Sequence, residues 1–231
     1  MRYNSLRDIE RPIVQLQNVS KTFKKNKNPV LVLNDINLEV RKASFTVLLG
    51  LSGSGKTTLL KIIGGFETAS SGKILFNEQD ISALSGEQLT AFRRKNVGMI
   101  FQDYYLDENL TFRENIELPA MFAKMNDAEI AERTKELIAG TDLAERLDHY
   151  PDEISGGQAQ RAAILRAVYL KPDLILADEP TSNIDDLNAK LVLDNLKDLQ
   201  QKGHKILIAS HDARVLEYAD TVVKIAEGKI I

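Results

Sequence analysis

A glycine-rich segment between two apolar runs constrains this chain most. Residues 50–58 read Gly-Leu-Ser-Gly-Ser-Gly-Lys-Thr-Thr, after the apolar run 45–49 and before the apolar run 59–63. This order predicts a strand, a loop and a helix, which is the context that a phosphate-binding P-loop requires. Glycine lets the backbone aim successive N–H groups into one concavity at the helix N-terminus. The segment therefore predicts a nucleoside triphosphate site.

The residues of this segment have distinct expected roles. Lys56 is expected to reach the β- and γ-phosphates, the Thr57 hydroxyl to ligate Mg²⁺, and Thr58 to add a donor near the α-phosphate. The remaining expected nucleotide contacts are Gly50, Leu51, Ser52, Gly53, Ser54 and Gly55. A flexible Gly/Ser turn is the plain alternative, but the flanking strand and helix disfavour it.

Composition narrows the class of protein. The 231 residues suit one large domain or two modest ones, and the absence of cysteine excludes disulfides and Cys-ligated zinc. A net charge of -3 with dispersed positive residues disfavours a nucleic-acid partner. Residues 1–11 lack the apolar core of a signal peptide, and no apolar run approaches the roughly 20 residues of a membrane span. We expect a cytoplasmic chain that is soluble on its own.

Hydrophobic periodicity predicts an α/β chain with a parallel core sheet. Alternation over 13–19 and 31–40 predicts two antiparallel β-segments, joined by a polar turn over 21–28. Further strands are expected at 73–76, 97–101, 173–177 and 205–209, with a closing hairpin at 221–225 and 228–231. A helix is expected over 186–202, ending at Gly203. The helical pattern over 111–148 interrupts the alternation and predicts an inserted subdomain.

A second nucleotide signal is the apolar run 174–177 followed by Asp178 and Glu179. This is the Walker B arrangement, in which Asp178 braces Mg²⁺ opposite Thr57. Glu179 has the position of a general base that orients and deprotonates water attacking the γ-phosphate. A buried strand followed by a solvated acidic turn is the alternative, and the upstream P-loop disfavours it.

A third signal is Ser155-Gly156-Gly157-Gln158, which runs into an apolar helical stretch. Ser155 is placed to cap the helix, and the free N–H groups of its first turn could receive a second anion. Taken alone, the segment fits an ordinary capped helix equally well.

Together, these motifs make the chain resemble the ATP-binding-cassette (ABC) transporter ATPases over essentially its whole length. Residues 155–158 resemble that family's signature motif. The resemblance implies one ABC ATPase domain over 1–231, with a RecA-like parallel core sheet and an N-terminal antiparallel β-subdomain. The core and β-subdomain would comprise 11–101 and 152–231, and an inserted α-helical subdomain about 104–151.

The resemblance also implies roles for four further residues. Phe23 matches the family's adenine-stacking aromatic, and Gln102 its glutamine loop, which contacts Mg²⁺ and the lytic water. Asp185 matches the loop that communicates across a dimer interface, and His211 the switch histidine at the γ-phosphate. Without the resemblance, Phe23 would be read as a core residue and His211 as incidental.

Partners follow from the same resemblance. Family members form head-to-tail homodimers around two ATP, so Ser155, Gly156, Gly157 and Gln158 would serve the nucleotide of a second copy. The helical insert and the glutamine loop would dock an integral-membrane permease. Leu51, Ile154 and Ala159 depart from common family patterns, but they are conservative in volume or lie beside the nucleotide contacts.

Within the family, the chain resembles the subgroup of lipoprotein release, macrolide efflux and antimicrobial-peptide resistance, which uses a separate permease. The resemblance lies in residues 97–102, Leu110-Thr111 with Glu114-Asn115, and 117–119. The expected function is the ATP-hydrolysing subunit of a transporter at the cytoplasmic face of the membrane. The alternative is a soluble cassette of repair, translation or iron–sulfur assembly. A single cassette, the lack of a long coiled coil and the acidic balance disfavour it. A degenerate regulatory cassette is disfavoured because Lys56, Asp178, Glu179 and His211 are all present.

Overall fold

A six-stranded sheet lies at the centre of the fold in the computed structural model, which describes residues 12–25, 28–41, 44–139, 141 and 143–231. The strand order is β10-β9-β3-β8-β7-β6; β6 to β9 run parallel with β3, and β10 pairs antiparallel with β9. The strands are β3 (Phe45–Leu49), β6 (Val97–Ile100), β7 (Leu174–Asp178), β8 (Lys205–Ser210), β9 (Thr221–Ala226) and β10 (Lys229–Ile230). Every residue of β7 is buried, as expected of a parallel strand covered on both faces.

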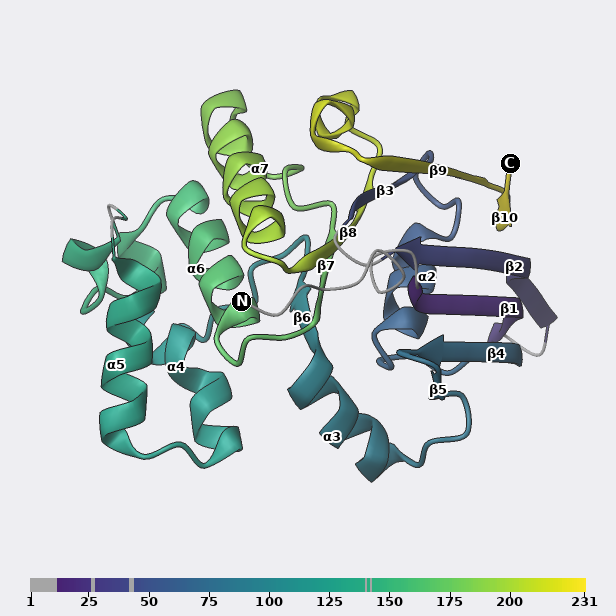
Figure 1. The fold of residues 1–231 in the computed structure, drawn as a ribbon. Coiled ribbons are helices and arrows are strands. Elements are labelled where there is room, and N and C mark those ends of the chain that lie inside the picture. The colour runs from purple at the N-terminus through teal and green to yellow at the C-terminus, as the bar shows by residue number, and fades with distance from the viewer. Residues whose placement is uncertain (1–11, 26–27, 42–43, 140, 142) are drawn as a thin grey trace.

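Alternate side chains of the central strands enter two different cores. Leu48 and Leu176 pack with α2 (Lys56–Ile63) and with an antiparallel sheet of order β2-β1-β4-β5. Val47 and Ile175 face the other way, into a core shared with α6 (Gly156–Val168) and α7 (Asp186–Gln201). The antiparallel strands are β1 (Pro12–Lys25), β2 (Asn28–Arg41), β4 (Ser71–Phe76) and β5 (Gln79–Asp80). Figure 1 shows α2 and the antiparallel sheet on one side of the central strands, and α6 and α7 on the other.

A block of helices projects beside α6 (Figure 1). It contains α4 (Phe112–Ala123), α5 (Asp127–Ile138) and the short 3₁₀ turns η1 (Ala144–Arg146) and η2 (Pro151–Glu153). Its buried residues, such as Phe112 and Leu143, form a third core together with Ala162 of α6 and Tyr169, which directly follows α6. The predicted architecture of parallel sheet, antiparallel sheet and helical insert is therefore confirmed, while the exact subdomain boundaries stay a prediction.

Two details differ from the sequence expectations. The turn predicted over 21–28 is wrong at both ends, because β1 continues to Lys25 and β2 begins at Asn28. Lys21 is buried in this strand, and its ammonium donates hydrogen bonds of 2.7 Å to Glu67 and to the carbonyl of Thr68. A helix without a counterpart among the expected elements, α3 (Gly86–Asn96), precedes β6. A third 3₁₀ segment, η3 (Ala213–Tyr218), follows β8.

Among the residues that the structure describes, no helix combines the length and the hydrophobicity needed to cross a bilayer.

Candidate functional site

The P-loop connects β3 to α2, as the sequence pattern predicts. Gly53 and Gly55 have φ of 78° and 104°, in the left-handed region that glycine adopts at little cost. Gly50 has no room for a side chain, because a Cβ there would lie 2.4 Å from the carbonyl oxygen of Ile225. Glycine is thus required both by backbone conformation and by close packing. Leu51, Ser52, Gly53 and Thr57 remain exposed, while Thr58 is partly covered.

Two buried polar groups of the loop have the chemistry of phosphate ligands. Lys56 is only 5% exposed, and its ammonium donates to the carbonyls of Gly50 at 2.7 Å and Leu51 at 3.0 Å. The hydroxyl of Ser54 is buried and lacks a hydrogen-bond partner within the described part of the chain. A buried hydroxyl without a partner is costly, and an anion seated in the loop would satisfy it. The residues present therefore fit a bound triphosphate.

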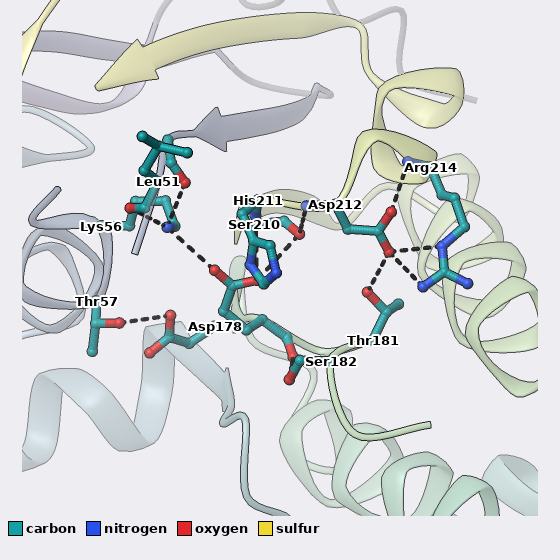
Figure 2. Close-up of polar contacts among 12 residues, drawn as sticks. Leu51, Lys56, Thr57, Asp178, Thr181, Ser182, Ser210, His211, Asp212 and Arg214 are labelled. Atoms are coloured by element: carbon teal, nitrogen blue, oxygen red, sulfur yellow. Dashed lines mark hydrogen bonds and ion pairs between the residues drawn. The ribbon is translucent and has the colours of Figure 1, made fainter. Parts of the chain in front are cut away.

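The two candidate Mg²⁺ ligands lie against each other. The hydroxyl of Thr57, in the first turn of α2, donates to Asp178 Oδ1 at 2.9 Å (Figure 2). Asp178 ends β7 and is 5% exposed; burial raises the pKa of its carboxyl, and the bond from Thr57 opposes this only in part. No group of three or more His, Cys, Asp or Glu among the described residues could hold a metal by itself. A site with one hydroxyl and one carboxylate suits Mg²⁺, which usually takes its other ligands from water and phosphate.

Glu179 is held between two candidate site residues. Its Oε1 lies 3.2 Å from the Lys56 ammonium, and its Oε2 lies 2.9 Å from His211 Nδ1. Glu179 is 9% exposed and has a φ of 48°, an uncommon conformation for a residue other than glycine. His211 directly follows β8, which lies between β3 and β7 in the sheet. The carboxyl ends of three neighbouring parallel strands thus converge, at the edge where open α/β sheets bind ligands (Figure 2).

Three other predicted site residues lie outside the hydrogen-bonded cluster around Glu179. Gln102 follows β6 and is exposed; its side chain hydrogen-bonds to neither Thr57 nor Asp178 in the described part of the chain. Asp185 caps α7 by accepting from the backbone N–H of Asn188 at 3.0 Å. Phe23 lies on β1, is 36% exposed, and has the Lys21 ammonium 4.7 Å from its ring centroid.

The signature segment forms the N-terminus of α6, as predicted. Ser155 is the N-cap: its hydroxyl accepts from the N–H of Gln158 at 3.3 Å, and the Gln158 side chain accepts from the N–H of Ser155 at 2.9 Å. Ser155 and Gly156 are exposed. Within the described residues, no hydrogen bond joins 155–158 to the P-loop of the same chain. One chain therefore brings Lys56, Thr57, Asp178, Glu179 and His211 together, but not the signature segment.

Three residues of the surrounding network were not anticipated from the sequence. Asp212 accepts from the Thr181 hydroxyl at 3.1 Å and from Arg214 Nε at 2.8 Å, as Figure 2 shows. Asn188 donates to Asp185 Oδ2 at 2.6 Å. The only sequence signal is proximity to His211 and Asp185, because neither spacing nor periodicity distinguishes these polar residues.

Comparisons with known proteins agree with this geometry. Residues 33–182 match the family described as ABC transporter. The chain is 40% identical over 221 residues to the macrolide export ATP-binding/permease protein MacB of Marinobacter nauticus, covering 96% of this chain and 34% of that protein. It is 38% identical to MacB of Brucella melitensis, over 95% of this chain and 34% of the relative. The chain thus spans about a third of the length of these relatives.

Solved structures of ATP-binding cassettes also match this chain. A dimer of the ATP-binding cassette MJ0796 in a post-hydrolysis state, bound to ADP and Pi, superimposes with a TM-score of 0.87 at 33% identity, over 94% of this chain and 96% of that one. CbiO1 of Clostridium perfringens, part of the ABC transporter complex cbiONQ, matches with a TM-score of 0.85 at 26% identity, over 96% and 88% of the two chains. The family predicted from the motifs is confirmed. With its P-loop, Walker B strand and signature helix in one fold, this chain belongs to the ABC transporter family as an ATP-binding cassette.

Proposed function

We propose that the chain is the ATP-hydrolysing subunit of a membrane ABC transporter of the macrolide-export and lipoprotein-release type. The observation that carries the proposal is the position of Glu179, held between Lys56 and His211 beside the Thr57–Asp178 pair. A carboxylate at this position can orient water toward a γ-phosphate, while Lys56 neutralises charge on the transferring group.

Each side chain has a role in this proposal. Lys56, Ser54 and the loop N–H groups bind and orient the phosphates, and Phe23 stacks on the adenine. Glu179 accepts the proton of the attacking water, and His211 fixes the carboxylate through its 2.9 Å contact. Thr57, Asp178 and, more peripherally, Gln102 would hold Mg²⁺, which supplies charge neutralisation at the phosphates when bound.

A second copy of the chain would complete the site. Ser155 and Gly156 are exposed at the N-terminus of α6, where N–H groups and the helix dipole favour an anion. They are not engaged with the P-loop of their own chain, so a partner's nucleotide is the ligand that we assign to them. The similar cassette MJ0796 was solved as a dimer bound to ADP and Pi, which supports this arrangement.

A groove between α3, β6, α4 and α6 is the surface that we assign to a permease. This cavity of about 360 Å³ is lined by Arg93, Arg94 and Arg166 together with apolar groups such as Met99 and Phe122. Phe122 and its neighbour Met121 are both 67% exposed. The charge and exposed apolar surface fit a cytoplasmic segment with acidic and apolar side chains. The MacB relatives are named ATP-binding/permease proteins, which supports such a partner at the cytoplasmic face of the membrane.

The central test is Glu179→Gln. The amide keeps the size of the carboxylate and one acceptor oxygen but cannot accept a proton, so hydrolysis should fall by about 10²–10⁴-fold. ATP binding, followed by isothermal titration calorimetry, should persist. Glu217→Gln, at an exposed position of η3 outside this network, is the control and should hydrolyse ATP normally. Undiminished hydrolysis by the Glu179→Gln protein would refute the proposed base.

A further inference from the structure

The segment that carries His211 is tied to the start of α7 by one arginine. Arg214 contacts Asp212 Oδ2 through Nε at 2.8 Å and Nη2 at 2.7 Å, and its Nη1 donates to Asp186. Asp186 is the first residue of α7, next to the N-cap Asp185. Asp212 in turn donates its N–H to Ser210 Oγ at 3.0 Å, and Ser210 donates to Glu179 Oε2 at 3.3 Å. A continuous polar chain therefore runs from the proposed base to α7.

The first turn of α7 is tied in the same way to the signature helix. Asn188 Nδ2 donates to Asp185 Oδ2 at 2.6 Å, and Asn188 Oδ1 accepts from Arg161 Nη1 at 3.4 Å. Gly157 packs directly on this side chain, because a Cβ at Gly157 would lie 2.1 Å from Asn188 Oδ1. A displacement of the α7 N-terminus would thus be transmitted to the residues that begin α6.

We infer that Arg214 and Asn188 are positioning residues that couple a chain's own ATP site to the signature segment it presents to its partner. The inference rests on the proposed function, because it assumes a dimer in which residues 155–158 serve the nucleotide of the second copy. A displacement of Glu179 or His211 on nucleotide binding would be transmitted to α7 through Asp212 and Arg214. From α7 it would be transmitted to α6 through Asn188.

The placement of the link supports coupling over a purely structural role. The side chain of Asp186 is 97% exposed, so its ion pair with Arg214 adds little to folding stability. Burial alone would raise the pKa of Asp212, but hydrogen bonds from Arg214 and Thr181 lower it below its ordinary value, which keeps the carboxylate charged. The Arg214 guanidinium thus joins an exposed carboxylate, Asp186, to a largely buried and charged one, Asp212. Contiguous polar contacts of this kind can carry energetic coupling between two sites.

The experiment compares ATP binding with dimer formation. Arg214→Ala, Asp186→Ala, the double variant and Asn188→Ala are each made on the Glu179→Gln chain, in which bound ATP should persist. A fluorescent ATP analogue measures binding by dilute, monomeric protein, and sedimentation velocity measures ATP-dependent dimerisation. Lys190→Ala is the matched control, since Lys190 pairs with Asp194 on the exposed face of α7 at 2.8 Å without joining the chain of contacts.

If the contacts couple the two sites, the variants should weaken dimerisation without weakening nucleotide binding by the monomer. Monomer affinity for the nucleotide should stay unchanged, while the dimerisation constant weakens by about two- to five-fold, the range that an exposed ion pair can supply. Arg214→Ala and Asp186→Ala should not add in the double variant, because both break the same contact. Asn188→Ala should show the same separation, and Lys190→Ala should show no change. Melting temperatures within about 2 °C of the parent would verify folding.

Other outcomes would overturn the inference. If Arg214→Ala leaves dimerisation unchanged, or if its effect adds to that of Asp186→Ala, the contact does not couple the sites. If it weakens monomer binding as much as dimerisation, Arg214 belongs to the nucleotide site instead. If the Glu179→Gln parent itself forms no dimer with ATP, the proposed dimer fails first, and the inference fails with it.

Discussion

The ammonium of Lys56 lies 3.2 Å from Oε1 of Glu179, so the P-loop and the Walker B strand share one ion pair. The same ammonium donates to the carbonyls of Gly50 and Leu51, and both members of the pair are buried. Lys56 therefore sets the shape of the loop and the position of the proposed base together. Its proposed role in binding phosphate is consistent with this position, because ATP would compete for that charge.

Lys56→Met should weaken ATP binding and abolish hydrolysis. Methionine has a similar length but neither charge nor donors, so the phosphates lose a charge-assisted hydrogen bond of about 1.5–3 kcal/mol. We expect ATP affinity to fall by roughly 10- to 150-fold and hydrolysis to be lost. Titration calorimetry measures the ATP affinity, and phosphate release measures the hydrolysis. Lys61→Met is the control, since Lys61 is an exposed residue in the last turn of the same helix; equal losses in both variants would contradict the assignment.

Asp178→Asn tests the buried carboxylate through pH. Because burial raises the pKa of Asp178 above its ordinary value of 3.8, the native protein binds this proton more tightly than the unfolded chain. Ionisation of Asp178 therefore destabilises the fold as pH rises through the window between these two pKa values. The destabilisation is complete above the folded pKa.

Asparagine cannot ionise and still accepts the bond from Thr57. Without nucleotide or Mg²⁺, the Asp178→Asn protein should melt above the wild type at pH 7.5, by about 2–4 °C for each kcal/mol removed. The difference should vanish below the ordinary pKa of 3.8, where both side chains are neutral. Hydrolysis should be lost at every pH. Differential scanning calorimetry across this range measures the effect, and an advantage that persists at pH 3 would contradict it.

Phe23→Ala tests the predicted adenine contact. Phe23 is partly exposed beside the Lys21 ammonium, so aromatic surface remains available for stacking. Loss of a stacking contact of about 0.5–1.5 kcal/mol should weaken ATP binding by roughly 2- to 12-fold. Binding of inorganic triphosphate, which has no base, should not change.

Two comparisons sharpen this prediction. Phe23→Trp should retain ATP affinity, because indole offers at least as large a stacking face. Phe66→Ala removes an aromatic ring that is 42% exposed and packs edge-on to Phe101 rather than against Phe23. Affinity that falls equally in Phe23→Ala and Phe66→Ala, or for triphosphate as well as ATP, would show a general effect on folding.

The sequence predicts the positions of the proposed catalytic residues better than it predicts the residues around them. Lys56, Asp178 and Glu179 lie in motifs whose local order of strand, loop and helix fixes their geometry, so pattern alone places them. Arg214 and Asn188 depend on contacts between segments distant in sequence, which periodicity does not encode. These contacts become visible only once the fold brings β8, α7 and α6 together.

The same limit applies to the fold. The sequence predicts β7 and β8 correctly, because strands buried on both faces appear as continuous apolar runs. In α3, Phe92 is the single buried residue, so hydrophobic periodicity is too weak to predict this helix. Its remaining signal is the capping box of Ser85 and Gln88. Lys21 is the converse case: a charge that suggests a turn is buried in a strand because Glu67 pairs with it at 2.7 Å.

Ser155 offers a way to separate capping from nucleotide recognition. Its hydroxyl caps α6, and the proposed dimer places the same hydroxyl at the partner's γ-phosphate. Ser155→Ala should lose both roles: about 1 kcal/mol of stability and most of the hydrolysis. Ser155→Asp keeps a strong cap, so its melting temperature should match the wild type. Its carboxylate would repel the phosphate, and hydrolysis should therefore still be lost.

Ser85 supplies the control, because it caps α3 with the same box of contacts and accepts from Gln88 N–H at 3.4 Å. Ser85→Ala should lower the melting temperature about as much as Ser155→Ala while leaving hydrolysis intact. Calorimetry and phosphate release on the three variants decide the matter. If Ser155→Asp hydrolyses ATP at the wild-type rate, the residue acts only as a helix cap, and the signature segment does not meet the partner's phosphate.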